Sequence, residues 1–324
     1  MHFESYLNII NENTPGIADS IRPSINRFIV RHVANFDCMS RQTGLLYGQV
    51  QSGKTSQMLG TIAASADIDF RLFILLTSDN TRLQGQTLQR ALETLDTFNV
   101  CGEDDDLRFR SIRLRKPTLV VLKKNQAILR RWADIIASSG FCSENPIFVV
   151  DDEADNASLN TLINQNDQST INSLLQNILN LSHSSLYLQV TATPQSILLQ
   201  RITSDFRPDF THYFEPGVGY LGGNFFYTEG STCIRSTDDL ERTILLQPDN
   251  VIPEGLRRAF WAFVVAGIHL IHKDNKSVCN LLIHPGLRIH EHDTIERKMG
   301  LLLRQIQEDL TNNANVVLHE LRDV

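Results

Sequence analysis

Residues 48–55 read Gly-Gln-Val-Gln-Ser-Gly-Lys-Thr, which fits the pattern G-x-x-x-x-G-K-[ST] of a phosphate-binding loop. Glycines let the backbone wrap closely around phosphate oxygens, and the N–H groups at the start of a helix supply positive potential. Lys54 would contact the β- and γ-phosphates, and the Thr55 hydroxyl would ligate magnesium. The sequence therefore predicts a cradle for Mg²⁺ and ATP, whose contacts come from Gly48, Gln51, Ser52, Gly53, Lys54, Thr55 and Ser56.

An apolar run, Ile147 to Val150, leads directly into Asp151-Asp152-Glu153-Ala154-Asp155. A buried strand has little reason to end in several acids unless they face a cation or a reacting water. Asp152 is expected to hold magnesium, and Glu153 to act as the catalytic base that activates water. Asp151 competes with Asp152 for the metal role. An acidic helix cap is the alternative interpretation, which the P-loop earlier in the chain disfavours.

A third motif, Thr191-Ala192-Thr193-Pro194, follows the apolar run Leu186 to Val190. Short hydroxyl side chains at a strand end can hydrogen-bond an acidic motif and respond to the γ-phosphate. Thr191 and Thr193 are therefore candidate coupling residues. By itself this motif is typical of a turn before a helix.

Apolar runs alternate with helical patterns in the way that predicts an α/β fold. We expect a RecA-like P-loop NTPase, with a parallel sheet and helices on both faces, because the strands are continuous apolar runs. Every motif above then lies at a carboxyl strand end, where ligands of such sheets bind. The strands are expected at residues 44–47, 71–77, 118–122, 147–150 and 186–190.

Changes in composition and in the apolar pattern along the sequence predict four regions. A polar N-terminal segment (1–40) precedes the RecA-like lobe (41–203), and a connector rich in glycine, proline and aromatic residues follows (204–250). Residues 251–324 are expected to begin a partial second α/β lobe. This lobe would contain helices at residues 254–272 and 291–310 and a strand at Val278–His284.

Composition narrows the classes of function. No apolar stretch reaches the length of a membrane span, the N-terminus does not resemble a signal peptide, and the five scattered cysteines show no pairing, which together predict a cytoplasmic protein. The net charge of −7 disfavours nucleic-acid binding through the whole surface. However, residues 108–131 contain nine basic side chains and no acidic one, directly after the acidic run Glu103–Asp106. This stretch is either a balanced solvated face or a track for phosphates.

In their order, GQVQSGKT, DDEAD and TATPQ resemble motifs I, II and III of superfamily 2 helicases. More closely, they resemble the Z-one domain family, helicase-like ATPases of bacterial defence and modification loci that are often labelled endonucleases. The resemblance covers residues 44–284, with specific motifs in the first lobe and weak ones afterwards. Such proteins normally continue beyond this length, and no motif VI with an arginine finger is recognisable. We therefore expect the chain to act with a C-terminal half that is missing here or with other subunits of a defence system.

The resemblance implies DNA as the most favoured nucleic-acid partner, although the residues do not distinguish DNA from RNA. Its motif Ia would touch the backbone through Thr77, Ser78, Arg82 and Gln86, with Lys123 and Lys124 on the same edge. Such contacts are sensitive to salt and blind to sequence. For Arg82, Lys123 and Lys124, ordinary surface positions remain the alternative.

The leading hypothesis is a helicase-like ATP hydrolase that couples hydrolysis to translocation on DNA or to its remodelling. Without an arginine finger, which accelerates such reactions by about 10³ to 10⁵, turnover by this chain alone is expected to be slow. The alternatives are a nucleotide-gated scaffold that recruits a nuclease or methyltransferase, a metal-dependent endonuclease and a small-molecule kinase. The histidines do not form a zinc pattern, and the candidate nuclease residues (Asp249, Asp274 and Lys276) are not expected on adjacent strands.

Overall fold

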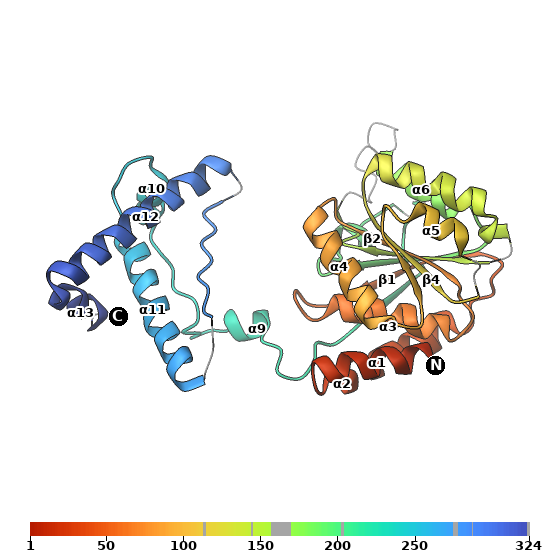
Figure 1. Cartoon of the computed structure of the whole chain (residues 1–324), viewed down its shortest axis with the longest axis horizontal. Coiled ribbons are helices and arrows are strands. Elements are labelled where there is room, and N and C mark those ends of the chain that lie inside the picture. Colours follow the sequence, from red (N-terminus) through yellow and green to blue (C-terminus); the bar gives the residue numbers. More distant parts are fainter. Residues whose placement is uncertain are drawn as a thin grey trace. The chain divides into compact units, whose positions relative to one another are not determined.

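The computed structural model describes residues 1–112, 115–143, 145–156, 170–201, 204–274, 278–286 and 288–322. The chain divides into two compact units, Met1–Asn224 and Phe225–Val324. Both units are drawn in Figure 1. Within the described residues, no helix is both long enough and apolar enough to span a lipid bilayer.

A seven-stranded sheet organises the first unit, and every strand pairing in it is parallel. The strand order is β3-β4-β2-β5-β6-β1-β7. The P-loop strand β1 and the acidic strand β5 therefore both flank β6, the strand of the third motif. The strands are β1 (Arg41–Tyr47), β2 (Leu72–Thr77), β3 (Asn99–Cys101), β4 (Thr118–Lys123), β5 (Ile147–Asp152), β6 (Ser185–Thr191) and β7 (Phe210–Tyr213).

Helices cover both faces of this sheet (Figure 1), which confirms the predicted RecA-like P-loop fold class. One face packs against α1 (His2–Asn13), α2 (Ile17–Phe28), α3 (Lys54–Ala66) and the end of α4 (Thr81–Thr94). The other face packs against α5 (Asp106–Ser111), α6 (Gln126–Ser139) and α7 (Thr170–Leu179). The remaining short helices of this unit are η1 (Ile29–Val33), η2 (Phe141–Ser143) and α8 (Gln195–Leu198).

The burial of both sheet faces explains why the strand sequences are continuously apolar rather than alternating. Every residue of β2 is buried, and so is every residue of β6. Successive side chains of β6 point to opposite faces. Leu186, Leu188 and Val190 therefore join the core beside α3, while Tyr187 joins the core beside α6 and α7.

The five expected strands form, but β3 and β7 were not expected. β3 has only three residues, and β7 lies in the residues predicted as connector, where its burial pattern mixes exposed and buried positions. β7 pairs with β1 at the edge of the sheet, opposite Gly44. A Cβ atom on Gly44 would lie 2.2 Å from the Phe210 ring, so glycine is what allows this edge pairing.

The N-terminal segment is helical, and it belongs to the core of the first unit. Tyr6, Leu7, Ile25 and Phe28 are each 1% exposed and pack in the same cluster as α3. The Tyr6 hydroxyl also donates to the Ser56 carbonyl oxygen at 2.9 Å, in the first turn of α3. The segment therefore buttresses the helix that follows the P-loop.

The second unit consists of helices in the residues that the structure describes. Its core contains Trp261, Leu302, Ile306 and Val317. The strand expected over Val278–His284 is wrong, because residues 278–286 form neither helix nor strand and no described strand lies beside them to supply ladder hydrogen bonds. The elements are α9 (Gly223–Phe226), which crosses the boundary, α10 (Asp239–Leu246), α11 (Glu254–Asp274), α12 (Ile289–Asn312) and α13 (Ala314–Arg322).

Candidate nucleotide site

The predicted phosphate cradle has the strand–loop–helix layout that phosphate binding requires. Residues 48–53 connect the end of β1 to the start of α3. Gly53 is the N-cap of α3 with φ of 91°, a left-handed conformation that favours glycine, and no described side chain caps the helix. The first N–H groups of α3 are thus left for an anion, which is the arrangement that binds phosphates.

Gly48 is required by packing at the start of the loop. A Cβ atom at this position would lie 2.3 Å from the ring of Phe214, which is 1% exposed. The Gly48 N–H donates to the Thr191 carbonyl oxygen at 3.4 Å. The loop therefore starts in contact with both β6 and the residue that follows β7.

The Lys54 ammonium makes a single long contact among the described residues, 3.3 Å to the Gln49 carbonyl oxygen. The same carbonyl accepts hydrogen bonds from the Ser52 backbone and side chain. Ser52, Lys54, Thr55 and Ser56 are all half-buried. Lys54 thus has hydrogen-bonding capacity to offer a phosphate, because an ammonium group has three donors.

The connector contacts the P-loop, which the sequence analysis did not expect. The Tyr220 hydroxyl donates to the Val50 carbonyl oxygen, and the Gln49 amide lies 3.5 Å from the Tyr213 hydroxyl. The loop is therefore held by Tyr213, the last residue of β7, and by Tyr220, which follows β7. The tyrosines of the connector were the available signal, but nothing in their spacing indicated a partner.

Asp151 and Asp152 of the acidic motif have different surroundings. Asp151 is fully buried on β5, accepts a hydrogen bond from Tyr187 at 2.6 Å and lies 3.1 Å from the Lys124 ammonium. Asp152 is only half-buried and accepts a hydrogen bond from the Glu153 N–H at 3.1 Å. Asp151 is therefore internally neutralised, and Asp152 is the better placed of the two to meet a cation.

Lys124 fixes the turn after β5. Its ammonium donates to the carbonyl oxygens of Asp152, Glu153 and Asn156 at 2.8, 2.8 and 3.0 Å. Glu153 sits in this turn with φ of 53°, a conformation that costs a non-glycine residue energy and often occurs at functional sites. The Glu153 side chain is exposed. The lysine thus stabilises a strained turn that presents Glu153 to solvent.

Asp152 and its neighbours fit a magnesium ion. Burial, and next the Glu153 carboxylate, raise the pKa of Asp152 to about 6, while Lys124 and Lys54 lower it. Carboxylates crowded in this way favour a divalent cation. No group of three or more side chains that could alone hold a metal occurs in the described residues. Magnesium in phosphate sites needs only one or two protein ligands, with water and phosphates as the others.

The third motif is hydrogen-bonded to the acidic motif. Thr191 donates to Asp155 Oδ1 at 2.6 Å, and the Thr193 hydroxyl donates to Asp155 Oδ2. The Thr193 N–H also donates to the Thr191 hydroxyl oxygen at 2.9 Å, and the Ala154 N–H donates to the Val190 carbonyl oxygen at 3.1 Å. The expected hydroxyl–carboxylate contacts therefore form, and they join the loops after β5 and β6.

The candidate nucleic-acid residues separate into exposed and buried groups. Arg82 and Gln86 are exposed and four residues apart on α4, so they share a helix face. Ser78 is half-buried. Thr77 is 3% exposed and its hydroxyl lies 3.4 Å from the Leu122 carbonyl oxygen. The Thr77 hydroxyl is therefore turned into the sheet in this conformation, and a contact of Thr77 with nucleic acid stays a prediction.

The two lysines at the end of β4 also have surroundings that were not expected. Lys124 is 4% exposed and its ammonium is engaged within the acidic loop, so it cannot reach a strand of nucleic acid in this conformation. Lys123 is half-buried, donates to the Thr81 hydroxyl at 3.1 Å and lies 3.6 Å from Glu103. Burial and internal pairing explain why a lysine at a strand end is not automatically a surface cation.

The basic stretch does not form one track along the site edge. Arg115 and Lys116 precede β4, so they lie at the opposite edge from Lys123. Arg131 donates to the Glu103 carbonyl oxygen at 2.6 Å and lies 3.6 Å from Asp104. Part of the stretch is therefore balanced by the acidic run before it, in agreement with the alternative of a balanced face.

Comparison of the sequence with protein-family models and with curated proteins gave no match. Among solved structures, the chain is similar to the Sulfolobus solfataricus SWI2/SNF2 ATPase core in complex with dsDNA (TM-score 0.35, 11% identity, 56% of this chain and 32% of that chain). It is also similar to the Pyrococcus furiosus Hef helicase domain (TM-score 0.40, 14% identity, 94% of this chain and 57% of that chain). A third similar structure is the Aeropyrum pernix ORC2 protein (TM-score 0.33, 10% identity, 89% of this chain and 68% of that chain).

The chain spans about a third of the first of these structures and somewhat over half of the second. These likenesses are distant. The fold assignment therefore stands on the parallel sheet and on the P-loop at the carboxyl end of β1, and it identifies the RecA-like P-loop fold class.

Proposed function

We propose that this chain binds Mg²⁺ and ATP at the carboxyl ends of β1, β5 and β6, and that it hydrolyses the bond between the β- and γ-phosphates. The observation that carries the proposal is the uncapped start of α3 beside a loop with unused lysine donors, at the same sheet edge as Asp152 and Glu153. This pairing of a phosphate cradle with carboxylates is what phosphoryl transfer requires.

Each residue has a distinct role in this proposal. The phosphates are held by backbone groups of the loop and of the first turn of α3. These groups belong to Gly48, Gln51, Ser52, Gly53 and Ser56. Lys54 neutralises the β- and γ-phosphates, and Thr55 with Asp152 binds magnesium, which supplies charge neutralisation when bound. Glu153 accepts the proton of the attacking water, and its exposed side chain lies clear of the Lys124 contacts that fix its backbone.

Asp155 couples the nucleotide state to the rest of the chain in this proposal. It accepts hydrogen bonds from both Thr191 and Thr193, so displacement of the loop after β5 must shift the loop after β6. A motif of this kind could transmit loss of the γ-phosphate. The Tyr220 contact with Val50 offers a second route, from the P-loop into the connector.

The finer proposal is a helicase-like motor that acts on nucleic acid, with DNA favoured by the resemblance to the Z-one family. Arg82, Gln86, Ser78 and Lys123 are the candidate contacts, because their side chains are at least partly exposed at the carboxyl edge. The same resemblance supports a role in a bacterial defence system, in the cytoplasm, with other subunits. Turnover by the chain alone is slow in this proposal, because no arginine finger is recognisable in the sequence.

ATPase activity should be measured for the wild type and for Glu153→Gln, with and without single- and double-stranded DNA. Glu153→Gln should retain nucleotide affinity and lose turnover by about 10²- to 10⁴-fold, the usual contribution of a general base. Equal turnover in the two proteins would exclude Glu153 as the base. Rapid ATP hydrolysis by the chain alone that is lost when one of its arginines is replaced would contradict the proposal that the chain lacks an arginine finger.

The DNA arm separates the motor from a nucleotide-gated scaffold. A motor should show DNA-stimulated turnover and a DNA affinity that changes with a non-hydrolysable ATP analogue. A scaffold would show neither effect while still binding nucleotide. Metal-dependent cutting of DNA that survives Lys54→Ala would instead support the endonuclease alternative.

A further inference from the structure

A cavity lies in the first unit, at the sheet edge opposite the P-loop. It has a volume of about 610 Å³ and is lined by the first residues of β1 and β6, by α7 and by residues 204–209. Arg41 lines this cavity, and the P-loop follows Tyr47 at the other end of the same strand. The length of β1, roughly 20 Å at about 3.3 Å per residue, therefore separates the two sites.

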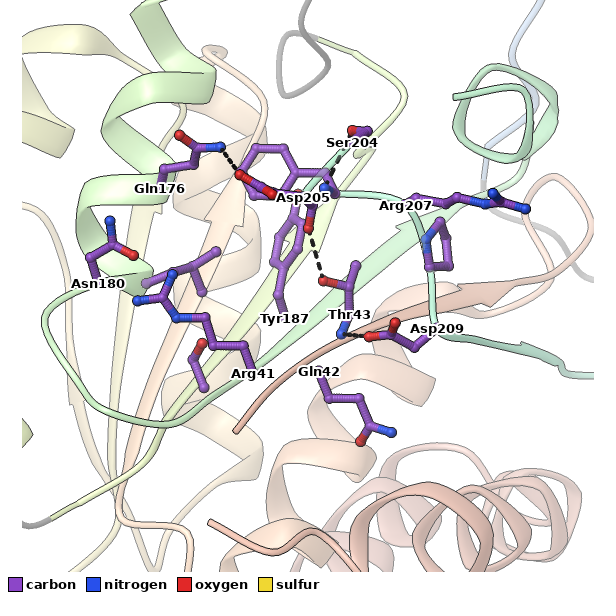
Figure 2. Close-up of a pocket in the computed structure, with 14 residues that line it drawn as sticks. Arg41, Gln42, Thr43, Gln176, Asn180, Tyr187, Ser204, Asp205, Arg207 and Asp209 are labelled. Atoms are coloured by element: carbon purple, nitrogen blue, oxygen red, sulfur yellow. Dashed lines mark hydrogen bonds between the residues drawn. The ribbon is translucent and has the colours of Figure 1, made fainter. Parts of the chain in front are cut away.

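The walls of this cavity are held by internal hydrogen bonds (Figure 2). The Thr43 N–H donates to Asp209 Oδ2 at 2.8 Å, and the Asp209 N–H donates to the Thr43 carbonyl oxygen at 2.7 Å. On the opposite wall, the Gln176 amide donates to Asp205 Oδ2 at 2.9 Å. The cavity is thus built from fixed elements, and its size suits a small molecule.

Hydrogen-bonding groups remain available on its lining, in the exposed side chains of Arg41 and Asn180. Among the described residues, no carboxylate pairs with Arg41, and neither the Arg41 nor the Asn180 side chain has a hydrogen-bond partner. In Figure 2 the Arg41 guanidinium points toward Asn180, whereas the Arg207 side chain extends away from the other labelled residues. An unpaired guanidinium beside an amide favours a carboxylate or phosphate group, because its planar donors match such oxygens.

The other polar groups select hydroxyl-bearing molecules. One carboxylate oxygen of Asp205 accepts a hydrogen bond from Gln176. The Asp205 side chain is exposed and can accept further hydrogen bonds from a ligand in the cavity. Buried Leu179 and Phe206 contribute only part of the lining, and polar side chains supply the rest. A hydrophobic ligand therefore does not suit this cavity, and a phosphorylated or carboxylated polyol does.

Tyr187 connects the cavity to the acidic motif. Its ring lines the cavity and packs against Phe206 with ring centroids 5.2 Å apart, and its hydroxyl donates to Asp151 at 2.6 Å. Asp151 precedes Asp152 on β5 and is also paired with Lys124, which holds the Glu153 turn. A ligand that shifts Tyr187 must therefore disturb the buried contacts beneath the proposed magnesium ligand.

We propose that this cavity binds a small phosphorylated or carboxylated polyol through Arg41 and Asn180, and that Tyr187 transmits its binding to the nucleotide site. The binding part stands on the cavity alone. The transmission part rests on the proposed nucleotide binding. The site is separate from the phosphate cradle, so the two can fail independently.

Binding is tested by calorimetric titration of the full chain with ribose 5-phosphate, gluconate, inorganic phosphate and ribose, with a non-hydrolysable ATP analogue and Mg²⁺ present to occupy the P-loop. Ribose 5-phosphate or gluconate should bind, which identifies the preferred anion, and uncharged ribose should not. Arg41→Ala should weaken binding at least tenfold. Arg90→Ala, an exposed arginine on α4, is the matched control and should bind as the wild type does.

Two results would overturn the site: no binding of any charged probe, or equal binding by Arg41→Ala and the wild type. Lys54→Met should still bind the probe, since Lys54 lies at the other edge, and its probe affinity should differ from that of the wild type only by the coupling to bound nucleotide. A chain that fails to bind ATP would therefore still test the cavity.

Transmission is tested with Tyr187→Phe, which removes the hydroxyl that donates to Asp151 and keeps the ring. In the wild type, the bound probe should change the affinity for a fluorescent ATP analogue by about fivefold or more, a usual size of coupling between sites. The variant keeps the ring that lines the cavity, so it should still bind the probe but lose this effect. An effect of the same size in the variant would overturn the route through Tyr187.

Discussion

Two lysines at the same edge of the sheet have opposite surroundings. Lys54 in the P-loop is half-buried and makes one described contact, at 3.3 Å to a carbonyl oxygen. Lys124 after β4 is buried and makes four contacts, to three carbonyl oxygens at 2.8 to 3.0 Å and to the Asp151 carboxylate at 3.1 Å. Both follow strands that end at the candidate site.

The difference separates a lysine available to a ligand from one that the protein uses itself. A buried ammonium must have its donors satisfied internally, because leaving it unpaired costs several kcal/mol. A lysine that binds a phosphate must keep donors in reserve. Contacts, rather than position after a strand, therefore decide which lysine can take part in chemistry.

The largest effect should come from breaking the saturated cluster. Lys124→Met leaves Asp151 buried without its cation, which should lower the free energy of unfolding by about 3 to 5 kcal/mol. Chemical denaturation measures this change. The control is Lys123→Met, because Lys123 is partly exposed and its pair with Glu103 is longer, at 3.6 Å. Lys123→Met should lower the free energy of unfolding by less than Lys124→Met does, and a larger loss would contradict the comparison.

Lys54→Met should do the reverse. The free energy of unfolding should change by no more than about 0.5 kcal/mol, because Lys54 makes only one long contact. Its affinity for ATP should fall by about 1.5 to 3 kcal/mol, the usual contribution of a hydrogen bond to a charged group. Titration with a fluorescent ATP analogue measures the affinity, and thermal unfolding provides the control. Unchanged affinity would remove Lys54 from the phosphate site.

Continuous apolar runs and the P-loop pattern were enough to predict the five longer strands of the first unit and the fold class. The five longer strands are buried on both faces, which leaves a continuous apolar signature. β3 and β7 escaped this reasoning because one is very short and the other lies at an edge with exposed side chains. The strand expected near Leu282 failed because an apolar run forms a strand only where a neighbour completes the ladder.

The candidate site was predictable in its motifs and not in its supporting contacts. Asp151 and Asp152 could not be distinguished by sequence, because only the fold brings Lys124 and Tyr187 to one of them. Likewise, the contact of Tyr220 with the P-loop joins residues far apart in the chain. Long-range side-chain pairs of this kind leave no local pattern to read.

Removal of the threonine hydroxyls that contact Asp155 should lower the free energy of unfolding by a smaller amount. Thr191→Val should lower the free energy of unfolding by about 1 to 3 kcal/mol, because the buried hydroxyl donates to Asp155 and accepts from the Thr193 N–H. Thr193→Val should cost about 1 kcal/mol or less, because Thr193 is exposed to water. Both are measured by chemical denaturation.

The coupling role is tested separately from stability. Each threonine variant should keep its ATP affinity, since neither side chain belongs to the proposed cradle, but should reduce DNA-stimulated turnover. Turnover that DNA stimulates as strongly as in the wild type, in a variant that folds, would remove the hydroxyl from the coupling route.

The smallest effect should come from a single exposed contact to nucleic acid. Arg82→Ala should reduce the slope of log affinity against log salt concentration by about 1, because one phosphate contact is lost, and should do so for every sequence tested. Fluorescence anisotropy with single-stranded DNA over a range of salt concentrations measures this slope. Thr77→Val is the matched control at the same edge, since its hydroxyl faces the Leu122 carbonyl oxygen. Loss of slope in the Thr77 variant but not in the Arg82 variant would mean that side-chain exposure in this conformation does not identify the residues that meet a ligand.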